Sequence, residues 1–436
     1  MPPQINAKGQ WFTEYSGPWA GIDTQKPPVL IADNASPAFN NFMLRNAEIR
    51  SSPALLLFAN GLSTDPIVGL SSFVDINGTY HTVYWAGNKL IQYDPAAGPP
   101  PWVVVGVASP SNMDNNPVSY RAFANSIYYT DISQTIGKPS SGGGGASVIT
   151  PFLAYWNGID AAPVFTQTFS DASVSNSIAG ISKTDSPTVG GSLPGGPTVV
   201  GPLAIGGQYL GELNNHLILA NVMVLDQNSN TLYNFPNLIW WSANGLPLQW
   251  DPTQNTSAGF NSFLDVPDLI TGLATIGVAG YIFRTNGITQ FAPSGSAVTP
   301  FTFDHMWASD HGIGNVVPWS IAQYGPNAAF IATDDIYALS VTQAKKIGGT
   351  ARDAIMADLA AQPILPKLLS NKPFACITPI FKAGYVYLTY KLYIPFATFI
   401  REWTYSFEDN NWAPRDLPFD FNAGTFPIFY CAPNVV

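Results

Sequence analysis

The sequence predicts an all-β protein, a β-propeller of about six four-stranded blades with an N-terminal arm and loop insertions. Asp, Glu, Lys and Arg make up 11% of the 436 residues, aromatic residues make up 13%, and Gly and Pro number 38 each. Average soluble domains contain about 25% charged residues. Gly and Pro turns between short aromatic and β-branched runs are typical of all-β architecture. In addition, a pattern of four strands recurs at roughly 45 to 55 residues, the spacing of propeller blades.

An irregular arm is predicted over residues 1–37, ahead of a propeller that extends over residues 38–436. The arm contains the pair Pro27-Pro28, and we expect it to dock through its aromatic rings rather than to form a free tail. These rings belong to Trp11, Phe12, Tyr15 and Trp19.

Residues 39–50 predict a hairpin, because two short strand-like runs flank a turn at residues 45–47. Propellers avoid open edges by joining the two ends of the ring within one blade. We therefore expect this hairpin to pair with the last unit, near residues 385–388 or Trp403.

The first repeating unit extends over about residues 67–107. Its strands are expected at residues 67–70, 80–86, 89–93 and 102–105, and Asn77-Gly78 before the second strand is a strong hairpin signal. Similar units begin near Ser119, Gly206, Leu269, Ser320 and Phe374.

Two insertions interrupt the repeat, and one segment has a helical pattern. Residues 137–149 include a Ser- and Gly-rich run that predicts a flexible loop, and residues 167–207 are rich in Ser, Gly, Thr and Pro. Residues 351–361 place apolar side chains on one helical face and are followed by Pro363, so they predict a helix.

The chain contains no motif of a known catalytic, cofactor-binding or metal-binding site, and we predict a protein that is not an enzyme and has no cofactor. Asp304, His305, Asp310 and His311 are the strongest metal candidates, but the two histidines are six residues apart rather than four. We expect them to lie in a polar loop between blades. Asp334-Asp335 lies at a predicted turn, where both residue types are common. Carboxylate pairs for sugar cleavage come from separate strands, so this possibility stays open.

Aromatic side chains gather in two places, where they are suited to stacking on sugars or to filling a propeller core. Their alternating spacing on predicted strands favours the core. They are Trp240, Trp241 and Trp250 in one place and Trp403, Tyr405, Phe407 and Trp412 in the other.

The net charge of −10 argues against a surface that grips DNA, since phosphate binding needs clustered Lys and Arg. No membrane-spanning segment is expected, because the longest charge-free apolar stretch, residues 269–283, is too short. The N-terminus lacks the basic and apolar regions of a secretory signal. Synthesis in the cytoplasm is therefore expected.

One segment of the sequence contains a specific order of motifs. Residues 241–250, WSANGLPLQW, are followed by the hairpin sequence YIFRTNGITQF at 281–291, by PFTF at 300–303 and by GIG at 312–314. This order resembles the tail hub or nozzle proteins of tailed bacteriophages, also described as tail tubular protein B-like or phage stabilisation protein-like. The likeness covers roughly residues 28–360. In its opening hairpin, Ser51-Ser52-Pro53 replaces the turn that is usual in the family.

The resemblance implies a structural virion protein, made in the host cytoplasm and incorporated into the tail. Such proteins form a cyclic homo-oligomeric ring, expected here to be a hexamer, below the portal or adaptor ring. The ring extends the DNA exit channel, anchors tail fibres or plug proteins, and lets double-stranded DNA pass without specific binding. Two alternatives stay open: a receptor-recognition propeller that binds or cleaves carbohydrate, and a scaffold propeller unrelated to phages.

Overall fold

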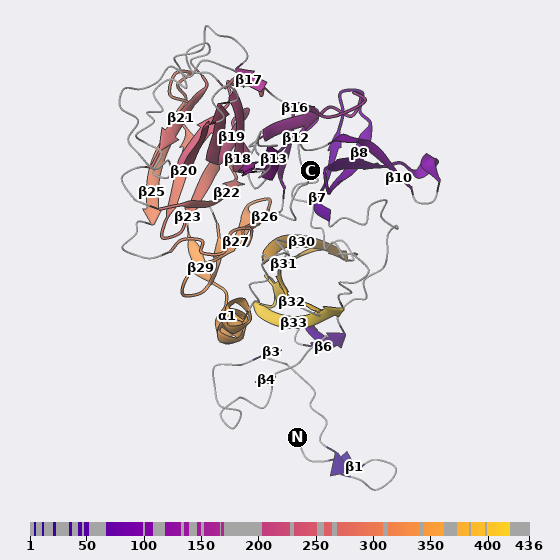
Figure 1. Ribbon diagram of the computed structural model, residues 1–436. Helices are drawn as coiled ribbons and strands as arrows, with labels where there is room; N and C mark the ends of the chain where they lie inside the picture. The colour runs from indigo at the N-terminus through magenta and orange to yellow at the C-terminus, as the bar shows by residue number, and fades with distance from the viewer. Residues whose placement is uncertain are drawn as a thin grey trace.

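The computed structural model describes most of the chain between residues 67 and 418. The ranges are 67–98, 101–107, 118–131, 152–165, 203–226, 231–250, 257–263, 268–307, 313–340, 343–361, 373–382, 385–396 and 399–418, with short strands elsewhere. This part forms an all-β, six-bladed β-propeller, as predicted (Figure 1). Each blade is an antiparallel sheet whose strands lie side by side in the order of the chain.

The first three blades extend from residue 67 to residue 262. Blade 1 comprises β7 (Ile67–Val74), β8 (Tyr80–Ala86), β9 (Lys89–Tyr93) and β10 (Trp102–Val107). Blade 2 comprises β11 (Ser119–Phe123), β12 (Ser126–Asp131), β15 (Phe152–Trp156) and β16 (Val164–Phe165). Blade 3 has a fifth strand and comprises β17 (Gln167–Phe169), β18 (Leu203–Leu213), β19 (His216–Asp226), β20 (Thr231–Trp241) and β21 (Gly259–Ser262).

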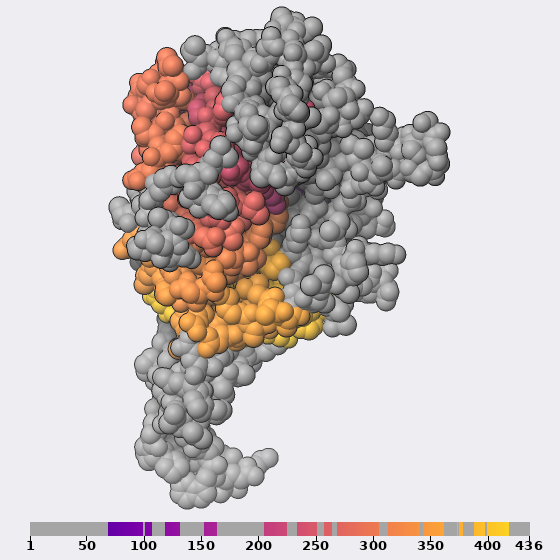
Figure 2. Space-filling view, turned by 60° about the vertical axis from the view of Figure 1, so that its left-hand side comes forward, coloured from indigo at the N-terminus to yellow at the C-terminus, as the bar shows by residue number. Residues whose placement is uncertain are grey.

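The last three blades extend from residue 270 to residue 418. Blade 4 comprises β22 (Ile270–Ile276), β23 (Ala279–Arg284), β24 (Ile288–Pro293) and β25 (Phe301–Trp307). Blade 5 comprises β26 (Ala322–Tyr324), β27 (Asn327–Ile331), β28 (Ile336–Leu339) and β29 (Ala344–Lys346). Blade 6 comprises β30 (Phe374–Lys382), β31 (Tyr385–Pro395), β32 (Phe399–Ser406) and β33 (Asn411–Pro418). Figure 2 shows blades 3 to 6, from pink to yellow, arranged down one side of the molecule.

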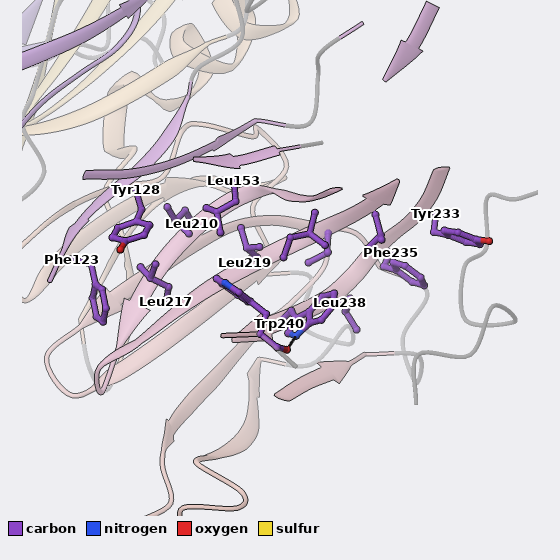
Figure 3. Close-up of a cluster of buried hydrophobic side chains, with 14 residues drawn as sticks. Phe123, Tyr128, Leu153, Leu210, Leu217, Leu219, Tyr233, Phe235, Leu238 and Trp240 are labelled. Atoms are coloured by element: carbon purple, nitrogen blue, oxygen red, sulfur yellow. Dashed lines mark hydrogen bonds between the residues drawn. The ribbon is translucent and has the colours of Figure 1, made fainter. Parts of the chain in front are cut away.

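Successive blades pack through buried apolar side chains. One strand of each blade contacts the corresponding strand of the next blade, in the order β7, β11, β18, β22, β26 and β30. Five core clusters fill the junctions from blade 1 through to blade 6. In the cluster between blades 2 and 3, Tyr128 and Leu153 of one sheet face Leu210, Leu219 and Trp240 of the other (Figure 3).

Glycine allows close packing where β18, β22 and β26 approach one another. A Cβ atom at Gly211 on β18 would collide with the side chain of Leu273 on β22, and one at Gly272 on β22 would collide with Ile321 beside β26. Neither position has room for a larger residue unless the side chain of Leu273 or Ile321 moves.

A single α-helix lies in the described part of the chain, at the predicted place. α1 (Arg352–Ala360) follows blade 5 and contacts β32 of blade 6 through Asp358, which accepts hydrogen bonds from Trp403 Nε1 (2.7 Å) and Arg401 Nη1 (3.3 Å). The 3-10 turns η2 (Pro95–Ala97) and η6 (Gly349–Ala351) are the other helical segments of this part of the molecule. The described residues include no helix with the length and apolar character that crossing a membrane requires.

The chain before residue 67 contributes short strands that join none of the six blade sheets. β1 (Gln4–Ile5) pairs with β2 (Trp11–Phe12), β3 (Gly21–Ile22) pairs in parallel with β4 (Ala35–Ser36), and β5 (Phe42–Arg45) pairs with β6 (Glu48–Ser51). β3 and β5 lie against the outer strand β33 of blade 6. The hairpin predicted at residues 39–50 is therefore present as β5 and β6. The expected pairing with the last blade is wrong, because among the described strands β33 pairs only with β32.

Both predicted insertions contain strands at their ends. β13 (Thr135–Lys138) pairs with β14 (Ala146–Ile149) at the first insertion, between β12 and β15 of blade 2. The second insertion begins in β17 and ends in β18, since Gln167 pairs with Ala204. Residues 139–145 and 170–202, the central parts of the two insertions, lie outside the described residues.

Candidate functional site: an apolar turn face

One face of the propeller is formed by the turns that follow β7, β11, β18, β22, β26 and β30 and by the connections that precede the outermost strand of each blade. Hydrogen bonds show that β18, β22 and β26 end on the same side. Thr275, near the end of β22, donates from Oγ1 to the Glu212 carbonyl near the end of β18, and its amide donates to Gln323 Oε1 of β26. These turns therefore share one side of the disc, which we call the turn face.

Most exposed large hydrophobic side chains of the described residues lie on this turn face. Leu269, Val103 and Val104 lie elsewhere, and the other eight of the eleven are at or beside these turns: Val74, Ile76, Tyr80, Ile159, Leu246, Leu248, Val278 and Val298. Scattered exposed apolar residues are normal on soluble proteins, whereas their concentration on one face indicates an interaction surface.

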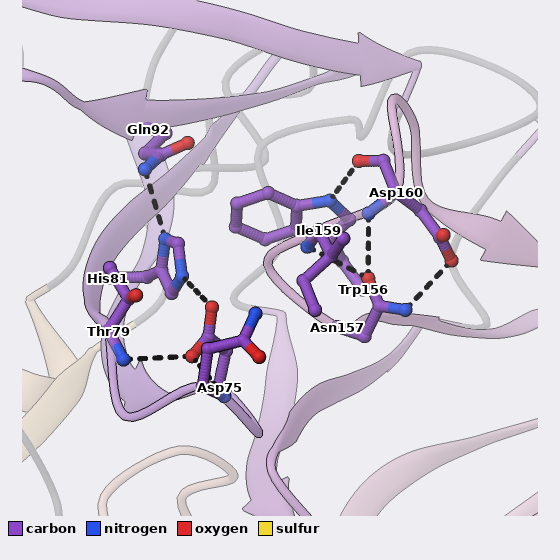
Figure 4. A network of polar contacts seen from close by, with 9 residues as sticks. Asp75, Thr79, His81, Gln92, Trp156, Asn157, Ile159 and Asp160 are labelled. Carbon is purple, nitrogen blue, oxygen red and sulfur yellow. Dashed lines mark hydrogen bonds and ion pairs between the residues drawn. The ribbon is translucent and has the colours of Figure 1, made fainter.

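The β7–β8 turn of blade 1 is held by a buried polar network (Figure 4). Asp75 Oδ1 accepts hydrogen bonds from the amides of Asn77 (2.9 Å) and Thr79 (2.8 Å). Asp75 Oδ2 accepts from His81 Nε2 at 3.1 Å, and His81 Nδ1 accepts from Gln92 Nε2 at 3.0 Å. The Nε2–H tautomer of His81 satisfies both contacts. The turn is thus fixed on its inner side while Ile76, 74% exposed, points outward.

The β15–β16 turn of blade 2 has its own network and packs on that of blade 1. Asn157 Oδ1 accepts from the amides of Ile159 (3.0 Å) and Asp160 (2.8 Å), and Trp156 Nε1 donates to the Asp160 carbonyl (2.8 Å). Gly158, with φ +82°, lies so close to His81 that a Cβ there would be 2.5 Å from Nε2. The two turns therefore form one platform, on which Ile76 and Ile159 are exposed.

Aromatic contacts support the inner side of this platform. The His81 ring stacks on Phe73 with centroids 5.1 Å apart and meets Trp156 edge to face at 5.3 Å. The hydrogen bond from His81 is the main cause that lowers the pKa of the Asp75 carboxyl from its ordinary value. Asp75 therefore stays ionised and keeps the turn closed at neutral pH.

The carboxylates at residues 334 and 335 have the turn role that the sequence predicts. Asp335 Oδ1 accepts from the amides of Ile336 (2.8 Å) and Gly348 (3.0 Å), and burial raises its pKa. Asp334 accepts from Tyr337 Oη and from Lys346 Nζ at 2.7 Å. Their hydrogen bonds to the turn and to the adjacent strand give both groups a structural function.

The candidate metal residues are described only in part. Asp304 is exposed on β25, and the backbone of His305 pairs with Thr289, while Asp310 and His311 lie outside the described residues. Within the described part of the chain, no group of three or more His, Cys, Asp or Glu side chains is placed to hold a metal ion. The prediction for this loop stays a prediction.

The predicted aromatic clusters are propeller core. Trp240, Trp241 and Trp250 are all less than a tenth exposed, and Trp240 Nε1 donates to the Trp250 carbonyl at 2.8 Å. The second cluster is equally buried at Trp403, Tyr405 and Trp412, whereas Phe407 is partly buried. The buried rings are unavailable for stacking on a sugar.

The segment that carries the family resemblance is a packed structural unit. The Asn315 amide donates to the Arg284 carbonyl (2.8 Å), and Thr271 Oγ1 donates to the Asn315 carbonyl (2.8 Å). A Cβ at Gly314 would collide with the backbone of residues 284–287. Residues 313–315 are thus fixed on the β23–β24 turn, and the motif has a role in joining blades 4 and 5.

No protein-family model matches the chain, and no curated protein matches it. Among solved structures, a fucose-specific lectin from Aleuria aurantia, described as a six-bladed β-propeller, aligns with a TM-score of 0.33 and 14% identity over 82% of this chain and 91% of the lectin. The NanB sialidase from Streptococcus pneumoniae aligns with a TM-score of 0.32 and 8% identity, over 71% of this chain and 63% of the sialidase. A prolyl endopeptidase structure gives a TM-score of 0.36 and 10% identity over 86% of this chain. The chain spans less than half the length of that structure and of a similar putative dipeptidyl aminopeptidase IV from Bacteroides ovatus. These similarities concern the fold.

Proposed function

We propose that this chain is a structural subunit of a bacteriophage tail hub or nozzle, without catalytic activity. The six-bladed propeller is the fold that the sequence resemblance implies. Part of the segment that carries the resemblance packs in the interior, as expected of a motif that preserves a structure rather than a catalytic centre. Trp241 and Trp250 are less than a tenth exposed, and Gly314 lies against the backbone of residues 284–287.

The apolar turn face is the single observation that carries the proposal. The chain has 18 Lys and Arg plus 28 Asp and Glu, hence 46 charged side chains in 436 residues. It nevertheless presents eight large exposed hydrophobic side chains on one side of the disc. Two of its turns are fixed by hydrogen-bond networks, so little conformational entropy is lost when a partner binds them. Such a preformed apolar face is suited to permanent protein contacts.

In this proposal the turn face contacts the portal or adaptor ring above, and copies of the chain form a closed cyclic ring of six. Contacts between neighbours in a cyclic ring of this kind are heterologous, so each copy offers two different flanks. The net charge of −10 suits a channel wall that double-stranded DNA passes without binding. Tail fibres or plug proteins would attach outside the ring, and the protein would be made in the host cytoplasm and located in the virion tail.

A carbohydrate-binding or carbohydrate-cleaving propeller is the alternative that the aromatic clusters first suggested. The tryptophans of both clusters are buried, so these aromatic side chains do not support a carbohydrate-binding site. A glycan screen and a hydrolysis assay on the purified chain test this alternative directly.

The proposal is tested by locating and counting the chain in purified phage particles. An antibody against the chain should label a single vertex of the particle, at the base of the tail. Mass spectrometry against the capsid protein as internal standard should give six copies per particle. Labelling over the whole capsid, or absence of the chain from purified particles, would overturn the proposal.

A further inference from the structure

The outer strands of the blades differ in how their free edges are protected. Exposed sheet edges attract further strands, and natural proteins protect them with Lys, Pro, short length or a covering segment. β29 ends in exposed Lys345 and Lys346, and β16 has only two residues. β33 contains Pro414 and Arg415 and is contacted by β3 and β5. β25 carries the exposed Asp304.

β10 of blade 1 has little of this protection. Its sequence, WVVVGV, contains no charge and no proline. Val103 is 40% exposed and Val104 is 43% exposed, and because successive side chains of a strand point to opposite faces, β10 is open on both sides. A register shift between Val104 and Gly106 is the single irregularity in its pairing with β9.

The strand is nevertheless held firmly at both ends. Trp102 is buried and meets Tyr84 and Tyr93 edge to face, with centroids 4.8 Å and 5.2 Å away. At the other end Gly106 lies against blade 2, where an added Cβ would be 3.0 Å from the Ala162 Cβ. β10 is therefore a rigid strand with an uncovered middle.

The N-terminal arm contains short strand segments that join no blade sheet of its own propeller. Gln4–Ile5 and Trp11–Phe12 pair only with each other among the described strands, and so do Gly21–Ile22 and Ala35–Ser36. Two-residue pairs are far shorter than ordinary strands and contribute little stability alone. Figure 1 shows β1 beyond blade 6, well separated from β10.

We propose that the outer edge of β10 accepts, by strand addition, the N-terminal arm (residues 1–37) of a second copy of this chain. This rests on the proposed ring and names the contact between its neighbours. Backbone hydrogen bonds would supply the affinity, and Val103 and Val104 would contact arm side chains on both faces of the sheet. Arm and edge are different surfaces, so the contact is heterologous and propagates around a ring.

The arm is long enough for this contact. Residues 1–20, which precede β3 and its contact with β33, span about 65 Å when extended. A compact chain of this length has a radius of gyration of about 22 Å. An arm that leaves its own propeller beside blade 6 can therefore reach blade 1 of a neighbour.

Photocrosslinking of the full chain tests the inference. A benzoylphenylalanine replaces Val104 in one sample and Val278, exposed on the turn face, in a control. Each is assembled from an equal mixture of unlabelled and 15N-labelled chains, both as concentrated protein and in phage particles. We expect crosslinks from position 104 to residues 1–37 that join labelled to unlabelled chains, and no arm crosslinks from position 278. Crosslinks from position 104 within one chain only, to another protein, or to no part of the arm would overturn the inference.

A double variant, Val103→Lys with Val104→Lys, separates this inference from the proposed function. Its melting temperature should remain close to that of the wild type, because both side chains are exposed. Its incorporation into particles should fall at least about tenfold, since charge on an edge strand opposes pairing. Normal incorporation of this variant would refute strand addition and leave the tail location intact. Absence of the wild-type chain from particles would instead refute the proposed function.

Discussion

Replacing Gly158 by Ala tests whether the two turns of the apolar platform are packed against each other. Two costs are expected. Gly158 has φ +82°, and a left-handed conformation costs an L-residue about 1–2 kcal/mol. The new Cβ would also lie 2.5 Å from His81 Nε2 and 3.1 Å from the Asp75 Cβ, and such overpacking costs about 1–3 kcal/mol. The free energy of unfolding should therefore fall by about 2–5 kcal/mol.

Gly78→Ala is a matched control in the facing turn. Gly78 has the same φ of +82°, but a Cβ there would meet no heavy atom within 4 Å. Its substitution should cost only the backbone strain, about 1–2 kcal/mol. Denaturant unfolding followed by tryptophan fluorescence measures both changes. Equal losses in the two variants would show that the turns do not contact each other and would refute the platform.

Three further predictions concern the same architecture. The pKa of Asp75 is lowered in the folded state. The contribution of its carboxylate to stability is therefore present above the ordinary pKa of 3.8 and is lost as pH falls through the lower folded value. Unfolding curves at several pH values should show this loss in the wild type and not in Asp75→Asn. Trp240→Ala removes a fully buried side chain and should cost about 3–5 kcal/mol in denaturant unfolding, whereas Leu246→Ala, at an exposed position, should cost less than about 0.5 kcal/mol. Asp358→Ala leaves the buried Trp403 N–H without its acceptor and should lower the free energy of unfolding, measured by calorimetry, by about 1–3 kcal/mol. The control Asp353→Ala, at an exposed position, should lower it by about 0.5 kcal/mol. Equal effects would contradict the attachment of α1 to β32.

Blade organisation was predictable from the sequence because its signals are local. Asn77-Gly78 and the aromatic run after it place β8 at Tyr80–Ala86, and Asp334-Asp335 marks the turn before β28. The expected unit starts at Ser119 and Phe374 coincide with β11 and β30. Such turns and short apolar strands are specified by neighbouring residues, and tertiary packing preserves them.

What the sequence did not predict depends on residues far apart in the chain. The Asp75–His81 pair packs against Gly158 and Trp156 of another blade, and no local sequence pattern predicts that contact. The extra strand β17 of blade 3 exists because the two ends of a long insertion meet. The hairpin of β5 and β6 was located correctly, but whether it pairs with β33 or lies beside it is decided by packing.

The sequence did not predict the turn face for a related reason. Its exposed apolar residues, such as Ile76, Val278 and Val298, come from separate blades and resemble ordinary strand ends in the sequence. Only the order of the strands shows that they share one side of the disc.

An asymmetric cryo-electron microscopy reconstruction of the phage particle tests the central claim most directly. The account predicts a closed ring of six copies of this chain around the DNA exit channel, directly below the portal or adaptor, with the turn face against that ring. A single copy on the tail axis, or isolated copies as spikes on the capsid, would contradict it.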